Sequence, residues 1–182
     1  MTIVVNIIIK LIKINIMESV IKKSLDKQIQ LELTSQLYYL RTALHCKLNG
    51  FEGLHKFFRA QSDEERSHML KILDYMVDMG IEHNFKYDLG EVCTTDTFTE
   101  EFDLVTVFLD SLDMEKEVTE NIVSIANHSL EVKDHDTYEF IQWFIKEQRE
   151  EEGKFTLLIQ KAKLLKNNSL GLYLLDQELL GK

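Results

Sequence analysis

Apolar side chains recur at steps of three and four residues along four long stretches of the chain. This is the period of a helix that buries one face, so the pattern predicts an all-α protein. Four long helices and a short fifth one are expected over about 18–48, 54–79, 99–129, 136–166 and 170–180. None of the 182 residues is proline, the commonest helix breaker, so long uninterrupted helices are permitted.

The connections predict how these helices are arranged. Those after the first and third helices are short, and short connections join antiparallel neighbours. Residues 81–98 show no helical period and suit a crossover between the two ends of a bundle. We therefore expect a four-helix bundle whose second and third helices run parallel. Thr97 with Glu100 is a capping-box pair that would start the third helix, and Asp134 or Asp136 would cap the fourth.

The first sixteen residues differ from the rest of the chain. They are isoleucine-rich and β-prone, and Lys10 and Lys13 interrupt a segment that is too short to span a membrane. Met17 stands directly before the helical pattern begins. Our leading hypothesis is that translation starts at Met17 and that residues 1–16 are absent from the working protein. The alternative is a genuine extension that packs on a partner, and in both cases residues 17–182 are expected to form one domain.

Four glutamates lie on the apolar stripes, one on each long helix: Glu32, Glu65, Glu115 and Glu151. On the third helix, the expected stripe leads through Leu109 to Glu115. A buried carboxylate is very costly unless it is paired or binds a metal ion. His68 follows Glu65 by three residues and shares its helix face, and carboxylates that converge with histidine are how bundles build paired metal sites. The alternative is a partly buried salt-bridge network with Arg41 or lysines.

Further polar side chains adjoin these glutamates. Gln148 shares the core face of the fourth helix with Glu151, while Glu64, Glu147 and Glu150 lie beside the stripes. This outer set either holds another cation or is an ordinary solvated face.

The ligand types favour a particular metal. Carboxylate-rich sites with one histidine suit hard to borderline redox metals, and iron is the obvious candidate. Two ions bridged by one carboxylate can pass electrons jointly to dioxygen. Tyr39 follows Glu32 by seven residues and shares its face. It would hydrogen-bond a site carboxylate or supply an electron, unless it is simply a core tyrosine.

Charge and cysteine content narrow the possible partners. The formal net charge is −10, and no basic stripe that would mark a nucleic-acid binder is present. Cys46 and Cys93 are far apart in the sequence and form no CxxC pattern, which argues against a disulfide framework or a zinc ribbon. Free thiols indicate a reducing, cytoplasmic setting. We expect neither a nucleic acid nor a membrane as a partner.

Over essentially Met17–Gly181, the chain resembles the bacterial non-haem ferritins. The motifs that carry the resemblance are Glu32 with Tyr39, residues 64–69 (EERSHM), Glu115, residues 140–148 (FIQWFIKEQ), residues 150–152 (EEE) and residues 171–176 (GLYLLD). The last of these is similar to the fifth helix of ferritins. The resemblance implies a ferritin-like four-helix bundle with one long crossover and a short C-terminal fifth helix.

The resemblance also implies a ferroxidase centre that binds two irons. The implied ligands are Glu32, Glu65 and His68 for the first iron and, for the second, Glu65 as a bridge, Glu115 and Glu151, with Gln148 adjacent. The implied third iron site consists of Glu64, Glu147, Glu150 and Glu151. No haem is expected, because the haem-ligating methionine of the bacterioferritins would fall at Arg66.

The function implied by the resemblance is iron storage with ferroxidase activity. A homo-oligomeric shell of 24 subunits would oxidise Fe(II) with dioxygen or peroxide and would deposit ferric oxyhydroxide inside. Two alternatives stay open: a cage that takes up iron without fast oxidation, and a di-iron redox enzyme on the same bundle without storage. The complete ligand set favours the ferroxidase over the first, and the lack of an ExxH motif on the fourth helix, where Gln148 and Glu151 stand, argues against the second.

Overall fold

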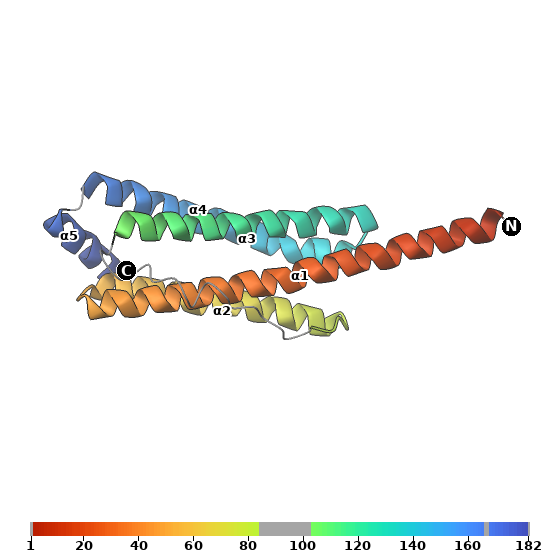
Figure 1. Ribbon diagram of the computed structural model, residues 1–182, viewed down its shortest axis with the longest axis horizontal. Coiled ribbons are helices and arrows are strands. Elements are labelled where there is room, and N and C mark those ends of the chain that lie inside the picture. Colours follow the sequence, from red (N-terminus) through yellow and green to blue (C-terminus); the bar gives the residue numbers. More distant parts are fainter. Residues whose placement is uncertain (1, 84–102, 166–167, 182) are drawn as a thin grey trace.

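The computed structural model describes residues 2–83, 103–165 and 168–181, with side chains from Ser19 onward. The helices in these residues are α1 (Thr2–Leu48), α2 (Glu52–Asp78), α3 (Leu104–Val132), α4 (His135–Leu165) and α5 (Ser169–Leu180). The four long helices lie alongside one another, and α5 lies across one end of the bundle (Figure 1). Helices α2 and α3 run in the same direction, opposite to α1 and α4, so the predicted topology is confirmed.

Helix α1 starts far earlier than the pattern predicts. It begins at Thr2 and not near Glu18, and its first part projects beyond the bundle (Figure 1). The expected start is wrong because nothing in the sequence stops the helix: neither glycine nor proline occurs before Gly50, and isoleucine lowers helix propensity only slightly. A start of translation at Met17 stays a prediction. Within the described residues, no helix has a stretch that is both long and apolar enough to cross a membrane.

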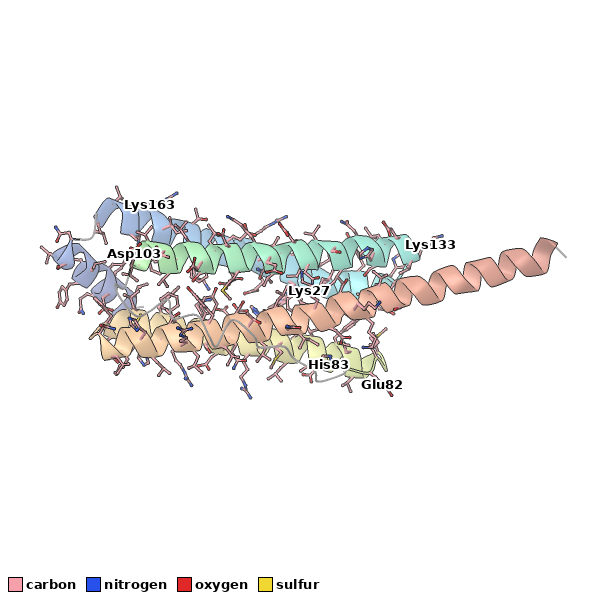
Figure 2. The ribbon with its side chains drawn as sticks, in the orientation of Figure 1. Lys27, Glu82, His83, Asp103, Lys133 and Lys163 are labelled. Atoms are coloured by element: carbon pink, nitrogen blue, oxygen red, sulfur yellow. The ribbon has the colours of Figure 1, made fainter. Side chains whose placement is uncertain are left out.

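Helix α3 begins later than predicted. Asp103 is its N-cap and has an extended backbone, and its carboxylate accepts hydrogen bonds from the backbone N–H groups of Val105 and Thr106. The expected start near Thr99 is therefore wrong, while the capping pair at 97 and 100 lies outside the described residues. Figure 2 shows Asp103 and Lys133 at the two ends of this helix.

The first half of α3 also buries a different stripe from the expected one. Phe108 is fully buried, whereas Leu109, its apolar neighbour, is exposed. Steps of four and three residues back from Glu115 pass through Ser111 to Phe108, and Ser111 is buried as well. Ser111 is polar and therefore interrupts the apolar pattern of the buried face. The leucines on either side of it, Leu109 and Leu112, gave a continuous apolar stripe that indicated the wrong face.

The core consists of two apolar clusters at opposite ends of the bundle. One includes Phe58 and Phe155 near α5, and the other includes Ile72 and Phe144 at the far end. On each long helix, the glutamates of the predicted site stand between the residues of these two clusters. A buried polar layer therefore crosses the middle of an otherwise apolar core. Cys46 is a buried free thiol in the first cluster, and Cys93 lies outside the described residues.

Helix α5 closes one end of the bundle by capping α2. Phe51, the N-cap residue of α2, has no side chain that can accept a hydrogen bond. Asp176 of α5 takes this role, because its Oδ1 accepts a hydrogen bond of 2.8 Å from the backbone N–H of Leu54. The two helices approach so closely that a Cβ atom on Gly53 would stand 1.8 Å from the backbone oxygen of Asp176.

This close approach predicts opposite effects of two glycine-to-alanine substitutions. We expect Gly53→Ala to destabilise the metal-free protein by roughly 1–3 kcal/mol, because the backbone of α5 must move away. We expect Gly153→Ala to stabilise it by roughly 0.5–1 kcal/mol, because Gly153 lies within α4 and glycine is a poor helix former. Within the described residues, a Cβ there would meet no atom within 4 Å. Thermal unfolding of both variants measures the effects, and equal stabilities would contradict the proposed packing of α5.

Candidate metal centre

The four long helices bring their polar stripe residues together in the middle of the bundle. These residues are Glu32 from α1, Glu65 and His68 from α2, Glu115 from α3, and Gln148 and Glu151 from α4, and all of them are buried. Each follows from the local helical period, because it lies three, four or seven residues from apolar core positions of its own helix. The prediction that these side chains are buried is confirmed.

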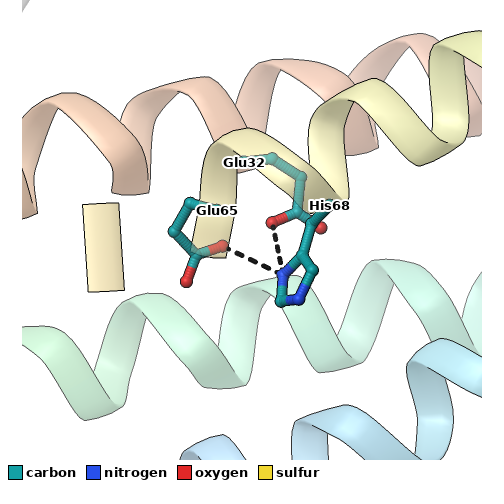
Figure 3. Close-up of side chains that lie close together, drawn as sticks. All are labelled: Glu32, Glu65 and His68. Carbon is teal, nitrogen blue, oxygen red and sulfur yellow. Dashed lines mark ion pairs between the residues drawn. The ribbon is translucent and has the colours of Figure 1, made fainter. Parts of the chain in front are cut away.

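Glu32, Glu65 and His68 form a fully buried group, which we call the inner group (Figure 3). The ligand atoms of the three side chains all lie within 4.8 Å of one another. His68 Nδ1 lies 3.4 Å from Glu65 Oε2 and 3.7 Å from Glu32 Oε2. Among the described residues, neither Glu32 Oε2 nor Glu65 Oε1 has a hydrogen-bond partner. Two buried oxygens without a donor, next to an imidazole, fit a bound cation.

A chain of amide groups orients Glu32. Its Oε1 accepts a hydrogen bond of 2.8 Å from Gln28 Nε2, and Gln28 Oε1 accepts one of 2.7 Å from Asn121 Nδ2. Both amide residues are buried, and Asn121 links α3 to α1. One oxygen of Glu32 is thus held in place while the other remains directed at the inner group.

Glu115 is held by two donors on neighbouring helices. The Tyr39 hydroxyl donates to Glu115 Oε1, and Gln148 Nε2 lies 3.1 Å from Glu115 Oε2. Burial and then the charges of Glu115 and Glu65 raise the pKa of Tyr39 well above its ordinary value. The phenol therefore keeps its proton at neutral pH and acts as a donor.

Glu151 is held in a different way, by a positive charge. Lys154 Nζ lies 2.7 Å from Glu151 Oε1 and 2.9 Å from Oε2, and Gln61 Nε2 donates to Oε2 at 3.0 Å. Neither Glu115 nor Glu151 belongs to the inner group. Both carboxylates pair with donors, which offsets the repulsion between like charges in this layer.

Electrostatics at the centre disfavour several negative charges at once. Burial, followed by the charges of Glu115 and Glu32, raises the pKa of Glu65 well above its ordinary value. Burial also raises the pKa of Glu115 to about 7, although the hydrogen bonds from Tyr39 and Gln148 oppose this shift. Such a cluster is stabilised by protons or by a cation.

The imidazole of the inner group responds to the same carboxylates. Burial acts to lower the pKa of His68, but Glu32 and then Glu64 and Glu151 outweigh it, so the pKa lies above its ordinary value. The inner group thus carries protons that a metal ion would displace on binding.

A second group lies on the outer side of His68. Ligand atoms of Glu64, His68 and Glu147 lie within 4.8 Å of one another, and both glutamates are half-buried. Glu150, which was expected in the same third site, is exposed and lies outside both groups. The structure thus brings Glu64 and Glu147 together, and it links them to the inner group through the imidazole.

Sequence reasoning missed the side chains that support the ligands. The apolar and polar pattern assigns no role to Gln61, Lys154, Gln28 or Asn121. A signal for two of them exists, because Gln28 precedes Glu32 by four residues and Lys154 follows Glu151 by three, so each shares a helix face with its glutamate. Asn121 carries no such local signal, since its partner lies on another helix.

Comparisons with known proteins agree with this arrangement. The family model of the ferritin-like domain matches residues 22–165. A bacterial non-heme ferritin of Escherichia coli is 33% identical over 158 residues, covering 86% of this chain and 92% of the relative. One of Staphylococcus aureus is 31% identical over 163 residues, covering 86% and 91%.

A solved structure shares the architecture. The open pore ferritin of the archaeon Archaeoglobus fulgidus superposes with a TM-score of 0.77 at 28% identity, over 87% of this chain and 94% of that one. Because the family model covers most of the chain, and relatives more than 30% identical match it over nearly their whole length, the chain belongs to the ferritin family.

Proposed function

We propose that the buried polar layer is a ferroxidase centre that binds two ferrous ions side by side. As a member of the ferritin family, the protein stores iron and oxidises ferrous iron. The observation that carries the assignment to this layer is the pair of buried oxygens in the inner group. Among the described residues, Glu32 Oε2 and Glu65 Oε1 have no hydrogen-bond donor, and both belong to carboxylates of the group that contains His68.

The proposed ligands divide between two positions. Glu32, Glu65 and His68 hold the first iron, and Glu65 bridges to the second. Glu115 and Glu151 complete the second position, with Gln148 adjacent. The inner group is already assembled, whereas Glu115 and Glu151 must leave their hydrogen-bond partners in part, so we expect the first position to bind iron more tightly.

In the proposed reaction, the ligand side chains release protons when ferrous ions bind and then stay as charged ligands. Ferrous ions displace protons from Glu65, Glu115 and His68, whose pKa values are all raised. Two ferrous ions and two protons then convert one dioxygen into one hydrogen peroxide and leave two ferric ions. Tyr39, hydrogen-bonded to Glu115, holds that carboxylate in position.

Further parts of the proposal concern storage and assembly. Glu64 and Glu147, with Glu150 and Glu151, would form a third iron position on the route from the centre. We further propose that the subunits form a closed shell of 24 copies, which keeps the ferric product soluble inside.

Stopped-flow absorbance tests the centre directly. After aerobic addition of ferrous iron to metal-free protein, we expect a fast phase that saturates at about two irons per subunit. Slower growth of a soluble ferric product follows if the shell stores the mineral. A rate equal to that of iron without protein, together with precipitation, would contradict the proposed centre. A fast phase with no soluble mineral would indicate a redox enzyme without storage.

A further inference from the structure

Lys154 stands among the proposed iron ligands as a resident cation. Its ammonium group contacts both oxygens of Glu151 and also lies 2.7 Å from Gln61 Oε1 and 3.3 Å from Glu64 Oε2. Among the described residues, the ammonium thus has four oxygen atoms as hydrogen-bond acceptors, and they come from α2 and α4. An all-oxygen environment with carboxylates from two helices is also what a hard metal ion requires.

The ammonium and a metal ion cannot use Glu151 fully at the same time. Lys154 lies within 3 Å of both oxygens of this carboxylate, and Glu151 Oε2 accepts a further hydrogen bond from Gln61. A divalent ion bound there would be repelled by the ammonium at short range. One of the two cations must leave.

Competition between the ammonium and a metal ion concerns Glu151 and Glu64 and not the inner group. The three ligands of the inner group have no ion pair with a lysine or an arginine within the described residues. Glu151 and Glu64, in contrast, both pair with Lys154. The long unbranched side chain of Lys154 is 30% exposed, and lysine side chains of this kind commonly extend their charged end into water.

We propose that Lys154 is a tethered cation that competes with iron for Glu151 and Glu64, so that iron enters these positions only when the ammonium swings out to solvent. The inference rests on the proposed function, because it concerns the same centre. In the metal-free protein, Lys154 compensates the buried charge of Glu151. During iron uptake, it makes the inner group fill first and weakens every position that depends on Glu151 or Glu64.

Cobalt(II) titration of metal-free protein tests this role without any oxidation chemistry. We expect the parent to bind one Co²⁺ per subunit tightly and the next more weakly. Lys154→Met removes the charge while keeping a long side chain, and it should tighten the weaker binding on the order of tenfold. The tight site should change by less than about threefold, since among the described residues Lys154 forms its ion pairs with Glu64 and Glu151 and not with the inner group.

Two further variants guard the interpretation. Lys154→Arg keeps the charge and should preserve the difference between the two affinities. Lys154→Gln keeps a hydrogen-bond donor for Glu151 without the charge, and it should behave like Lys154→Met even where the methionine variant fails to assemble. Size-exclusion chromatography monitors assembly of each variant.

The outcomes separate this inference from the proposed function. If the parent binds two Co²⁺ and the neutral variants leave the weaker affinity unchanged, the role of Lys154 is overturned and the centre stands. An equal change at both sites would also overturn it, because the effect would not be confined to Glu151 and Glu64. A parent that binds no Co²⁺ would overturn the proposed function, and this inference with it.

Discussion

Replacement of Glu65 by alanine is expected to slow aerobic oxidation of ferrous iron by about 100-fold or more, because losing even an outer-shell partner of a metal ligand costs 10–100-fold. Glu65 is the only proposed ligand shared by both iron positions. It also lies in the inner group, with His68 Nδ1 3.4 Å from its Oε2. Its loss should therefore weaken both positions, and the two electrons can no longer be delivered together. The initial rate by stopped-flow absorbance, with iron added at about two per subunit, measures the effect.

Folding defects are not expected to cause this loss. The Glu65 carboxylate is surrounded by the like charges of Glu115 and Glu32, and within the described residues its Oε1 has no donor. Its removal thus relieves repulsion in the metal-free protein. Glu65→Gln, which keeps the volume of the side chain, should be equally slow, and both variants should assemble like the parent.

Two kinds of control variant make this result specific. Glu120→Ala removes an exposed carboxylate from α3 and should oxidise iron at the parental rate. Substitution of Glu147 or Glu150 should leave the first fast phase of iron oxidation nearly unchanged and should slow the turnover that follows it. Parental oxidation rates in Glu65→Ala would show that the bridging role is wrongly assigned.

The contribution of Glu115 to the stability of the metal-free protein is expected to fall as pH rises from about 5 to 7.5. Burial raises the pKa of Glu115 to about 7, whereas in the unfolded chain its pKa is near 4.5. Between these two values the folded state binds more protons than the unfolded state, so the free energy of unfolding falls with pH. For one fully buried group with this shift, the loss amounts to about 3 kcal/mol.

The pKa values of Glu65 and His68 are raised as well, so these groups act in the same direction. Glu115→Gln isolates the contribution of one group, because glutamine does not titrate. The variant should gain stability relative to the parent as pH rises from 5 to 7.5. Thermal unfolding with a chelator present, at several pH values, gives this difference. Parallel profiles for parent and variant would refute the shifted pKa of Glu115, while added Co²⁺ should restore the stability of the parent at high pH.

The helices themselves were largely predictable. Helices α2, α4 and α5 lie within about two residues of the expected ranges, because the spacing of apolar residues reflects the backbone geometry of the helix. The errors have local causes. Residues 2–17 form helix despite their isoleucines, because no residue there breaks α1, and Ser111 concealed the buried face that leads to Phe108.

The sequence by itself determined which residues reach the centre. Each apolar stripe carries a glutamate, and His68 lies one turn after Glu65. Because burial of a carboxylate requires a partner, these side chains are stable only where they meet, in the middle of the bundle. The fold class follows from the spacing of the apolar residues and the topology from the lengths of the connections, while the burial of every residue assigned to the two iron positions follows from that constraint.

Only the tertiary structure decided how these residues are paired. In the structure, Glu32 and Glu65 lie next to His68. Glu115 accepts a hydrogen bond from Tyr39, and Glu151 forms an ion pair with Lys154. The physical reason is that helical periodicity specifies the face on which a side chain lies but not its partner across the core. That choice depends on the register between helices and on the balance of charge among all the groups that meet there.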